Sequence, residues 1–416
     1  MTTKDKLFII LSMALAVRLT LIIIFKTYIH PVTWEYEVIV NNLLSGKGFL
    51  FYFFDVPYRS LNAPLYSFLC AGIYILTNHS YLAVLLAQSL FTMFLALVIF
   101  KIAKIIFDEK VAFMSAIIVS FHPGFIYYDV FNLIPLSIDS FLIATAALLV
   151  LKFKDRPSIL NISLLGMMVG LGALSRGIIW ALIPFLSLYF ILFITRLALH
   201  EKFKIIIFFA IAAFIVITPW IIRNYVIHKR FIFIVSTTGE NLWRGNNKYA
   251  VGTSFNKEGK TIIELWPEEF RKKVFALDEI GQKNFFEKEA MYFIRKDPLG
   301  FIKRYITKIY YFWWFSPQSG IIYPKPYFII YRYLYSILLG FSILGLILSL
   351  ASGEKVIKGS VWLIIFIFMA IFLTQSLFYV EGRHRWLVEP LLIIFFSYGI
   401  NESYELLLRK IKLLSI

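Results

Sequence analysis

Ionisable side chains at the ends of long apolar runs are the residues of this sequence that could carry chemistry. Glu35 and Glu37 follow the first run, and Asp139 lies near the start of the fourth, about one turn inside a helix that Pro135 opens. A charge so close to hydrocarbon is costly unless it is paired or has a function, and a carboxylate there could act as a general base. Asp129, which precedes the fourth run, is expected to be an ordinary loop charge. Glu35 and Glu37 are two residues apart, so on a helix at most one faces a common site.

Basic side chains gather at the same ends of other apolar runs. They are Arg176, between the fifth and sixth runs, Arg223, after the seventh, and Arg383, His384 and Arg385, before the tenth. Guanidinium groups bind phosphate through paired, charge-assisted hydrogen bonds. Three clusters on one face favour an anionic lipid headgroup or a pyrophosphate as ligand. One alternative stays open, because Arg385 and Glu389 are four residues apart and could pair with each other.

Motifs that bind nucleotides or metals are missing from the sequence. There is no Walker A motif, no H-E-x-x-H, no Cys/His metal spacing and no dinucleotide fingerprint. The single cysteine, Cys70, excludes an internal disulfide. The free energy for any reaction must therefore be carried by the substrate itself.

Long apolar runs must position these side chains. Of the 416 residues, 60% are hydrophobic and 16% are charged, whereas soluble domains are about 45–50% apolar and about 25% charged. This composition excludes a soluble, a disordered or a collagen-like protein and predicts an all-α polytopic membrane protein. The ten predicted spans are 7–25, 81–106, 111–127, 135–151, 159–174, 177–195, 204–222, 329–351, 360–380 and 386–402.

Loop charge predicts the sidedness of the spans. The net charge of +17 is explained by Lys and Arg in cytoplasmic loops, which attract anionic lipid headgroups, and does not indicate a nucleic-acid partner. The run from Pro64 to Leu76 is about 13 residues long, too short to cross, and is typical of an interfacial or re-entrant helix. If it does not cross, the short basic connections fall on one side, and both termini are cytoplasmic.

Two long segments then lie on the extracytoplasmic side. The first is the loop 26–80, which belongs to an N-terminal transmembrane module, residues 1–222. The second, residues 223–328, is predicted to form a small extracytoplasmic domain of α/β or irregular structure, followed by a C-terminal transmembrane module at 329–416. The apolar spacing in the stretch 33–44 predicts a helix that lies along the membrane interface.

A series of short motifs runs from the first long loop to the last apolar run. The motifs occupy residues 34–49, 62–66, 122–128, 172–176, 219–224, 241–247 and 382–390. Their order and spacing resemble the GT-C superfamily of membrane glycosyltransferases, in particular the bacterial branch related to protein O-mannosyltransferases and to the aminoarabinose transferases of lipid A.

This resemblance implies an integral-membrane, inverting glycosyltransferase. The sugar would move from a polyprenyl-phosphate donor to an acceptor hydroxyl at the extracytoplasmic face of the cytoplasmic membrane. Glu35 matches the family's loop acid and general base, and Glu37 remains an alternative because Val32 and Thr33 stand where many members have an acidic pair. Asp139 matches the family's second acid. A divalent metal, Mg²⁺ or Mn²⁺, held by Glu35 and Asp139 is a further implication.

The resemblance also implies the partners. The donor phosphate and sugar would be bound by Arg176, Arg223, Arg383, His384, Arg385 and Tyr66. The acceptor would be a lipid, a glycan or a protein, membrane lipids would surround the chain, and no nucleic acid is involved. Two other functions stay open: a flippase or transporter of lipid-linked saccharides, and a non-catalytic assembly subunit. Because the charged candidates other than Arg18 gather in one membrane half, we favour an enzyme over a transporter.

Overall fold

The computed structural model describes residues 2–53, 55–154, 157–194, 196–322 and 324–414, and these are mainly helical. Within these described ranges, eight helical segments are long and apolar enough to cross a membrane. They are α1 (Thr3–Ile24), α4 (Tyr81–Ile106), α5 with α6 (Glu109–Ser120 and Pro123–Phe131), α7 (Leu136–Phe153), α10 (Leu199–His228), α16 (Lys325–Ala351), α17 (Lys355–Leu377) and α18 (Glu389–Leu414). This confirms the all-α membrane fold.

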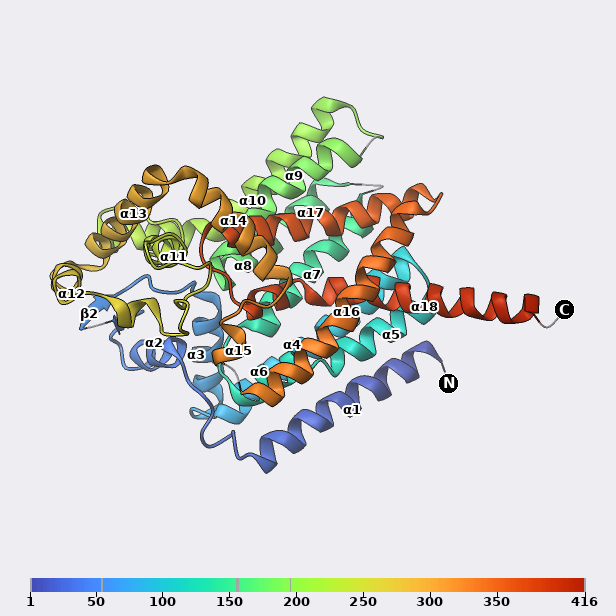
Figure 1. Cartoon of the computed structure of the whole chain (residues 1–416), viewed down its shortest axis with the longest axis horizontal. Helices are drawn as coiled ribbons and strands as arrows, with labels where there is room; N and C mark the ends of the chain where they lie inside the picture. The colour runs from blue at the N-terminus through green and yellow to red at the C-terminus, as the bar shows by residue number, and fades with distance from the viewer. Residues whose placement is uncertain (1, 54, 155–156, 195, 323, 415–416) are drawn as a thin grey trace.

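The fifth and sixth predicted spans form shorter apolar helices. The fifth is α8 (Ile159–Ser175), and the sixth is a 3₁₀ turn, η1 (Gly177–Ala181), that continues into α9 (Leu182–Phe193). Each of the ten predicted runs therefore contains a helix in its described part, while Thr195, the last residue of the sixth run, lies outside the described residues. Eight of the ten meet the usual length for a span. Both chain termini lie at the same end of the helix bundle (Figure 1). We refer to the opposite end as the distal end.

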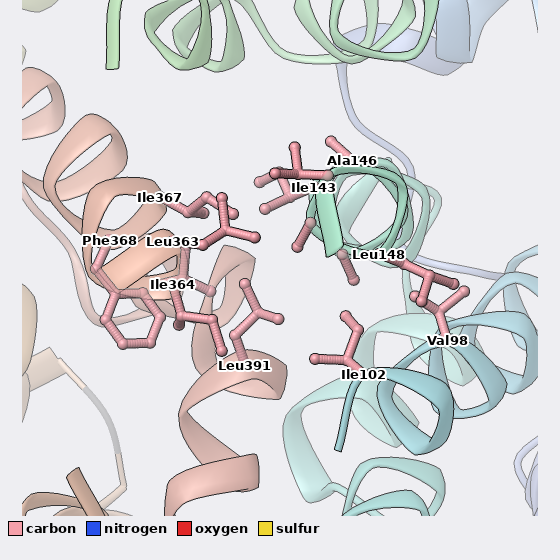
Figure 2. Packing of buried hydrophobic residues seen from close by; sticks show 14 of the residues in the cluster. Val98, Ile102, Ile143, Ala146, Leu148, Leu363, Ile364, Ile367, Phe368 and Leu391 are labelled. Carbon is pink, nitrogen blue, oxygen red and sulfur yellow. The ribbon is translucent and has the colours of Figure 1, made fainter. Parts of the chain in front are cut away.

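A continuous apolar core joins the membrane helices. Figure 2 shows side chains of α4, α7, α17 and α18 that meet in it, among them Ile102, Ile143, Ile364 and Leu391. Each of these four side chains is at most 1% exposed. Lipid tails are as apolar as these side chains, so close packing rather than transfer from water must hold such helices together.

Glycines allow two helix pairs to approach closely. In α8 a Cβ atom at Gly166 would lie 2.3 Å from the Phe209 carbonyl oxygen of α10. In α16 a Cβ atom at Gly345 would lie 2.0 Å from the Phe395 carbonyl oxygen of α18. A side chain at either position would push the two backbones apart, so these contacts depend on the missing Cβ.

The first long loop contains the two predicted interfacial helices. They are α2 (Glu35–Leu44) and α3 (Leu65–Thr77), and between them lies a hairpin of β1 (Phe51–Phe53) and antiparallel β2 (Val56–Tyr58). Val32, just before α2, forms a parallel bridge with Asn132 after α6. The Val32 N–H donates to the Phe131 carbonyl, and the Leu133 N–H donates to the Val32 carbonyl. The loop is thereby fixed to the distal end of the membrane helices.

The segment 223–328 differs from the α/β alternative of our expectation. Its elements are α11 (Thr238–Gly245), η2 (Ile262–Leu265), α12 (Glu268–Phe275), α13 (Glu279–Lys296), α14 (Pro298–Trp313) and α15 (Ser319–Ile322). Within the described part of this segment, β-type backbone pairing is limited to an isolated antiparallel bridge between Phe255 and Thr261. Trp243, Trp266 and Phe286 pack together as the core of this segment. Apolar residues in α13 recur at helical spacing, so this segment forms helices where we had allowed for strands.

Candidate active site

Four of the predicted site residues shift the pKa of one hydroxyl group, that of Tyr36 in α2. Burial raises the pKa of the Tyr36 phenol. The neighbouring carboxylates of Glu35 and Asp139 raise this pKa further, whereas the guanidinium groups of Arg176 and Arg383 oppose them. The structure thus brings charges from α2, α7, the end of α8 and the segment before α18 to a common point at the distal end.

Asp139 has the external partner that its position requires. It lies in the first turn of α7, a helix that begins directly after Pro135, and it is fully buried. The Arg176 Nε donates to Asp139 Oδ2 at 2.6 Å, and the Ser175 hydroxyl donates to Oδ1 at 2.5 Å. Arg176 stands at the C-terminal end of α8 with extended backbone, and 29% of its side chain is exposed. The guanidinium group is therefore anchored and accessible at the same time.

Glu35 and Glu37 face different surroundings, as their spacing predicts. Glu35 is half-buried, and the Asn62 amide donates to its Oε1 at 3.2 Å. It lies in the first turn of α2. Glu37 is buried, accepts a hydrogen bond from the Tyr74 hydroxyl at 2.7 Å and lies 3.2 Å from His79 Nε2. Glu37 thus fastens α2 to α3, and Glu35 is the carboxylate beside the other charges.

Arg383 and His384 lie in a 3₁₀ turn, η3 (Gly382–Leu387). Arg383 is 39% exposed, and its Nε lies 3.1 Å from Glu381 Oε2, while Ser254 of the 223–328 segment donates to Oε1 of the same glutamate. His384 is buried and its Nδ1 accepts the Glu381 backbone N–H at 3.1 Å. Burial lowers the pKa of His384 well below its usual value, and Arg383 and Arg176 lower it further. His384 is therefore a neutral neighbour of the two arginines.

Arg385 is in a different place from the one we predicted. Its side chain is 1% exposed, and the guanidinium carbon lies 3.7 Å from the ring centre of Tyr335. Arg385 donates to the Tyr331 hydroxyl at 2.9 Å and lies 3.3 Å from Glu389, which also contacts His122 Nε2 at 3.0 Å. The alternative of pairing with Glu389 is the one that the structure shows, because the 3₁₀ turn directs this side chain into an aromatic cage.

Arg223 and Tyr66 support the site without facing it. Arg223 Nη1 donates to the Arg59 carbonyl at 2.5 Å and to the Ser60 hydroxyl at 3.1 Å, and the guanidinium stacks over Trp220. It thus holds the first long loop against α10. Tyr66 is 1% exposed and donates to Gln88, and its ring packs edge-on against Tyr36 at 5.1 Å.

A divalent metal between Glu35 and Asp139 does not fit this arrangement. Both Asp139 oxygens already accept hydrogen bonds, one from Ser175 and one from the cationic Arg176. A guanidinium group on the carboxylate opposes a second cation at the same oxygens. Among the described residues, moreover, no group of three or more His, Cys, Asp or Glu side chains is arranged to hold a metal ion.

Two features of the site, and one buried pair outside it, were missed from the sequence. Tyr36 stands between the two glutamates that we singled out, but a tyrosine carries no charge that marks it. Ser175 precedes Arg176 and shares its partner. Asp129 is a buried residue and not a loop charge. Arg18 of α1 donates to its carboxylate at 3.0 Å, and the Thr92 hydroxyl donates to the same oxygen at 2.6 Å. Arg18, a lone charge in the first apolar run, was the signal that could have indicated this pair.

The carboxylate of Glu279 joins the first long loop to the 223–328 segment. Glu279, at the start of α13, is buried and accepts hydrogen bonds from the backbone N–H groups of Arg59 at 2.6 Å and Ser60 at 2.9 Å. The Ser236 hydroxyl donates to it at 2.5 Å. Glu279 therefore links three segments that are far apart in the sequence.

Comparison with known proteins finds similar membrane glycosyltransferases. Residues 61–222 match the family described as dolichyl-phosphate-mannose-protein mannosyltransferase. The undecaprenyl phosphate-alpha-4-amino-4-deoxy-L-arabinose arabinosyl transferase of Wigglesworthia glossinidia brevipalpis is 27% identical over 183 residues, which are 41% of this chain and 31% of that relative. Both matches are to membrane glycosyltransferases of the kind that the sequence motifs resemble, and each covers less than half of this chain. This confirms the resemblance that the sequence motifs indicated.

Solved structures share the fold. The oligosaccharyltransferase of Archaeoglobus fulgidus in its apo form superposes with a TM-score of 0.60 at 13% identity, covering 98% of this chain and 52% of that chain. The archaeal oligosaccharyltransferase AglB from the same organism, in complex with an inhibitory peptide and a dolichol-phosphate, gives a TM-score of 0.57 at 12% identity, with coverages of 99% and 52%. This chain thus spans about half the length of these proteins and less than a third of its curated relative.

Proposed function

We propose that this chain is an inverting glycosyltransferase that moves a sugar from a polyprenyl-phosphate donor to an acceptor hydroxyl at the extracytoplasmic face of the membrane. The observation that carries this proposal is that one carboxylate, Glu35, and two guanidinium groups, Arg176 and Arg383, lie close enough to the Tyr36 hydroxyl for their charges to shift its pKa. A base beside fixed positive charge is what displacement of a phosphate by a hydroxyl requires.

The donor class is supported by the relatives. The curated relative is named for an undecaprenyl phosphate-linked aminoarabinose, and the archaeal oligosaccharyltransferase was solved with a dolichol-phosphate. Both compounds are long polyprenyl lipids with a phosphate headgroup. A lipid phosphate is also an activated leaving group, which agrees with the absence of nucleotide motifs from the sequence.

In the proposed reaction, the acceptor oxygen attacks the anomeric carbon from the face opposite to the phosphate. Glu35 takes the proton of the acceptor hydroxyl as the new carbon–oxygen bond forms. The bond between the anomeric carbon and the phosphate oxygen breaks, its electron pair leaves with the polyprenyl phosphate, and configuration inverts. Arg176 and Arg383 stabilise the negative charge on the departing phosphate.

Asp139 has a different role from that of a second acid in this proposal. Its oxygens are occupied by Ser175 and Arg176, so it acts as a positioning residue that fixes the Arg176 guanidinium. The remaining exposed part of Arg176 can then meet the phosphate without a large loss of side-chain entropy.

The extracytoplasmic location is supported by the arrangement of the chain. Both termini lie at one end of the bundle, and α2, which carries Glu35, lies at the opposite end (Figure 1). The short basic loops predict that the end with the termini is cytoplasmic.

The proposal is tested with Glu35→Gln, and Glu37→Gln is the matched control. Purified protein in nanodiscs would be given defined polyprenyl-phosphate sugars with candidate acceptors, and release of the free carrier would be followed. Glu35→Gln should lower the rate of release by about 10²–10⁴-fold with normal folding, because a general base contributes that much. Glu37→Gln should weaken the α2–α3 contact and affect the rate far less. Equal rates for Glu35→Gln and wild type would contradict the proposed base.

The same assay distinguishes the other functions. A flippase would move the donor across the membrane of a proteoliposome without releasing the carrier. A non-catalytic subunit would bind the donor and release nothing, and the replacement of the family's acidic pair by Val32 and Thr33 is the observation that favours it.

A further inference from the structure

An exposed apolar stripe runs along α13 and α14, outside the candidate active site. It consists of Met291, Tyr292, Leu299, Ile302, Ile306 and Tyr310, which are between 38% and 73% exposed. We refer to these six residues as the α13–α14 stripe. Scattered apolar side chains are normal on a protein surface, but a contiguous stripe indicates an interaction.

The stripe occupies one face of α14. Leu299, Ile302, Ile306 and Tyr310 recur at spacings of three and four residues, as one side of a helix requires. On the other side Lys308 and Phe312 are fully buried, and α14 packs there against α17 and η3. One face of α14 thus contacts the membrane helices, and the opposite face is left without a protein partner in the described part of the chain.

Positive charge borders the stripe. Lys288, Arg295, Lys296 and Lys303 are exposed beside it. Three acids lie nearby on α13 and at its end: Glu287 lies 2.6 Å from Lys283, Asp297 lies 3.5 Å from Arg304, and Glu289 follows Lys288. On α13, Lys288, Arg295 and Lys296 line an open hollow together with Glu287, Met291 and Tyr292. The border therefore complements an anionic surface.

The stripe is continuous with the surface that the membrane covers. α14 lies towards the distal end of the bundle (Figure 1) beside α17, which is a candidate span. Its last turn begins the aromatic run Tyr310–Phe315, which leads through α15 into the span α16. Tyrosine and tryptophan concentrate at the level of the lipid headgroups.

We propose that the α13–α14 stripe lies on the bilayer, with its apolar side chains at the headgroup–acyl boundary and its basic border on anionic phospholipids. An amphipathic helix with basic flanks binds a membrane in this way. Bulk lipid, and not a lipid-linked substrate or a protein, is the partner. The 223–328 segment then has a fixed height above the membrane, whatever reaction the site performs.

Spin labels can test this placement. In a Cys70→Ala background, Ile302→Cys and Ile306→Cys would be labelled in nanodiscs, with Lys272→Cys on α12, whose side chain is 75% exposed, as the control. Power saturation should show the labels at 302 and 306 more accessible to oxygen than to a water-soluble nickel chelate, and the label at 272 the reverse. Labels at 302 and 306 that behave like the one at 272 would overturn the proposal and indicate a protein or glycan partner. Leu299→Cys provides a further position if one variant fails to fold.

The anionic preference has its own test. Spin-labelled phosphatidylglycerol and phosphatidylcholine would be compared as probes, and the fraction held at the protein surface measured. The wild type should retain phosphatidylglycerol several-fold more strongly, and Lys288→Gln/Arg295→Gln/Lys296→Gln should remove most of this difference. A preference unchanged in the triple variant would contradict the role of the basic border.

Discussion

Arg383 and Arg385 are two residues apart in the same 3₁₀ turn, and their surroundings are opposite. Arg383 is 39% exposed and lowers the pKa of the Tyr36 hydroxyl, against the effect of Glu35. Arg385 is 1% exposed, caged by aromatic rings and paired with Glu389. A motif of two arginines therefore combines a residue for a ligand with a residue for the fold. Residue type alone does not distinguish them, but the helix that follows does, because Glu389 is four residues from Arg385.

The largest effect is expected from Arg385→Ala. It would leave the Glu389 carboxylate and His122 buried without their cation, and breaking a buried pair in this way costs about 3–5 kcal/mol. We expect a large fall in the thermal unfolding temperature in detergent, with poor yield of folded protein. Arg383→Ala is the control and should unfold close to the wild-type temperature. Similar stability for the two variants would contradict the division of roles.

A smaller effect, on binding and not on folding, is expected from Arg383→Gln. Loss of a hydrogen bond to a charged phosphate costs about 1.5–3 kcal/mol, which is about 10–150-fold in affinity. The Kd for a polyprenyl-phosphate sugar should rise by this factor, and Arg383→Lys should recover part of it because the charge is kept. Unchanged donor affinity in Arg383→Gln would remove Arg383 from the phosphate site.

The smallest effect concerns His384, between the two arginines. Its pKa is lowered in the folded protein, so the unfolded chain binds a proton at a higher pH than the folded one. Stability should therefore fall as the pH drops below about 6.5, by at most about 1.4 kcal/mol per pH unit. His384→Gln removes this proton uptake, so its free energy of unfolding should depend less on pH. Unfolding curves at pH 7.5, 6.0 and 5.0 would show it, and parallel slopes for both proteins would contradict it.

Much of the fold could be predicted from hydropathy. The ten apolar runs are helices, the short run after residue 64 is the predicted interfacial helix, and the stretch near Glu35 is helical. Each of these depends on local composition and spacing alone. The interior of the 223–328 segment could not be predicted as well, because contacts among Trp243, Trp266 and Phe286 decide it, and these residues are distant in the sequence.

The candidate site could be predicted in part. The approach of Glu35, Asp139, Arg176 and Arg383 follows from their common membrane depth, which loop charge and hydropathy indicate. The pairing of Asp139 with Arg176 across two helices, and of Arg18 with Asp129, requires the packing of the bundle. Tyr36 and Ser175 are polar but uncharged, so the sequence did not indicate that they would lie beside charged groups. Only the packing of the helices shows this.

Glu279 gives the molecule a mechanical linkage. Through Arg59 and Ser60 it fastens the first turn of α13 to a loop in which Asn62 holds Glu35. The two hydrogen bonds to Glu279 are 2.6 Å and 2.9 Å long, and close-packed interiors transmit displacement. A tilt of α13 would therefore displace the backbone from Ser60 to Asn62 and, with it, the carboxylate of Glu35. A helix that lies on the lipid surface would tilt in response to the thickness of the bilayer beneath it.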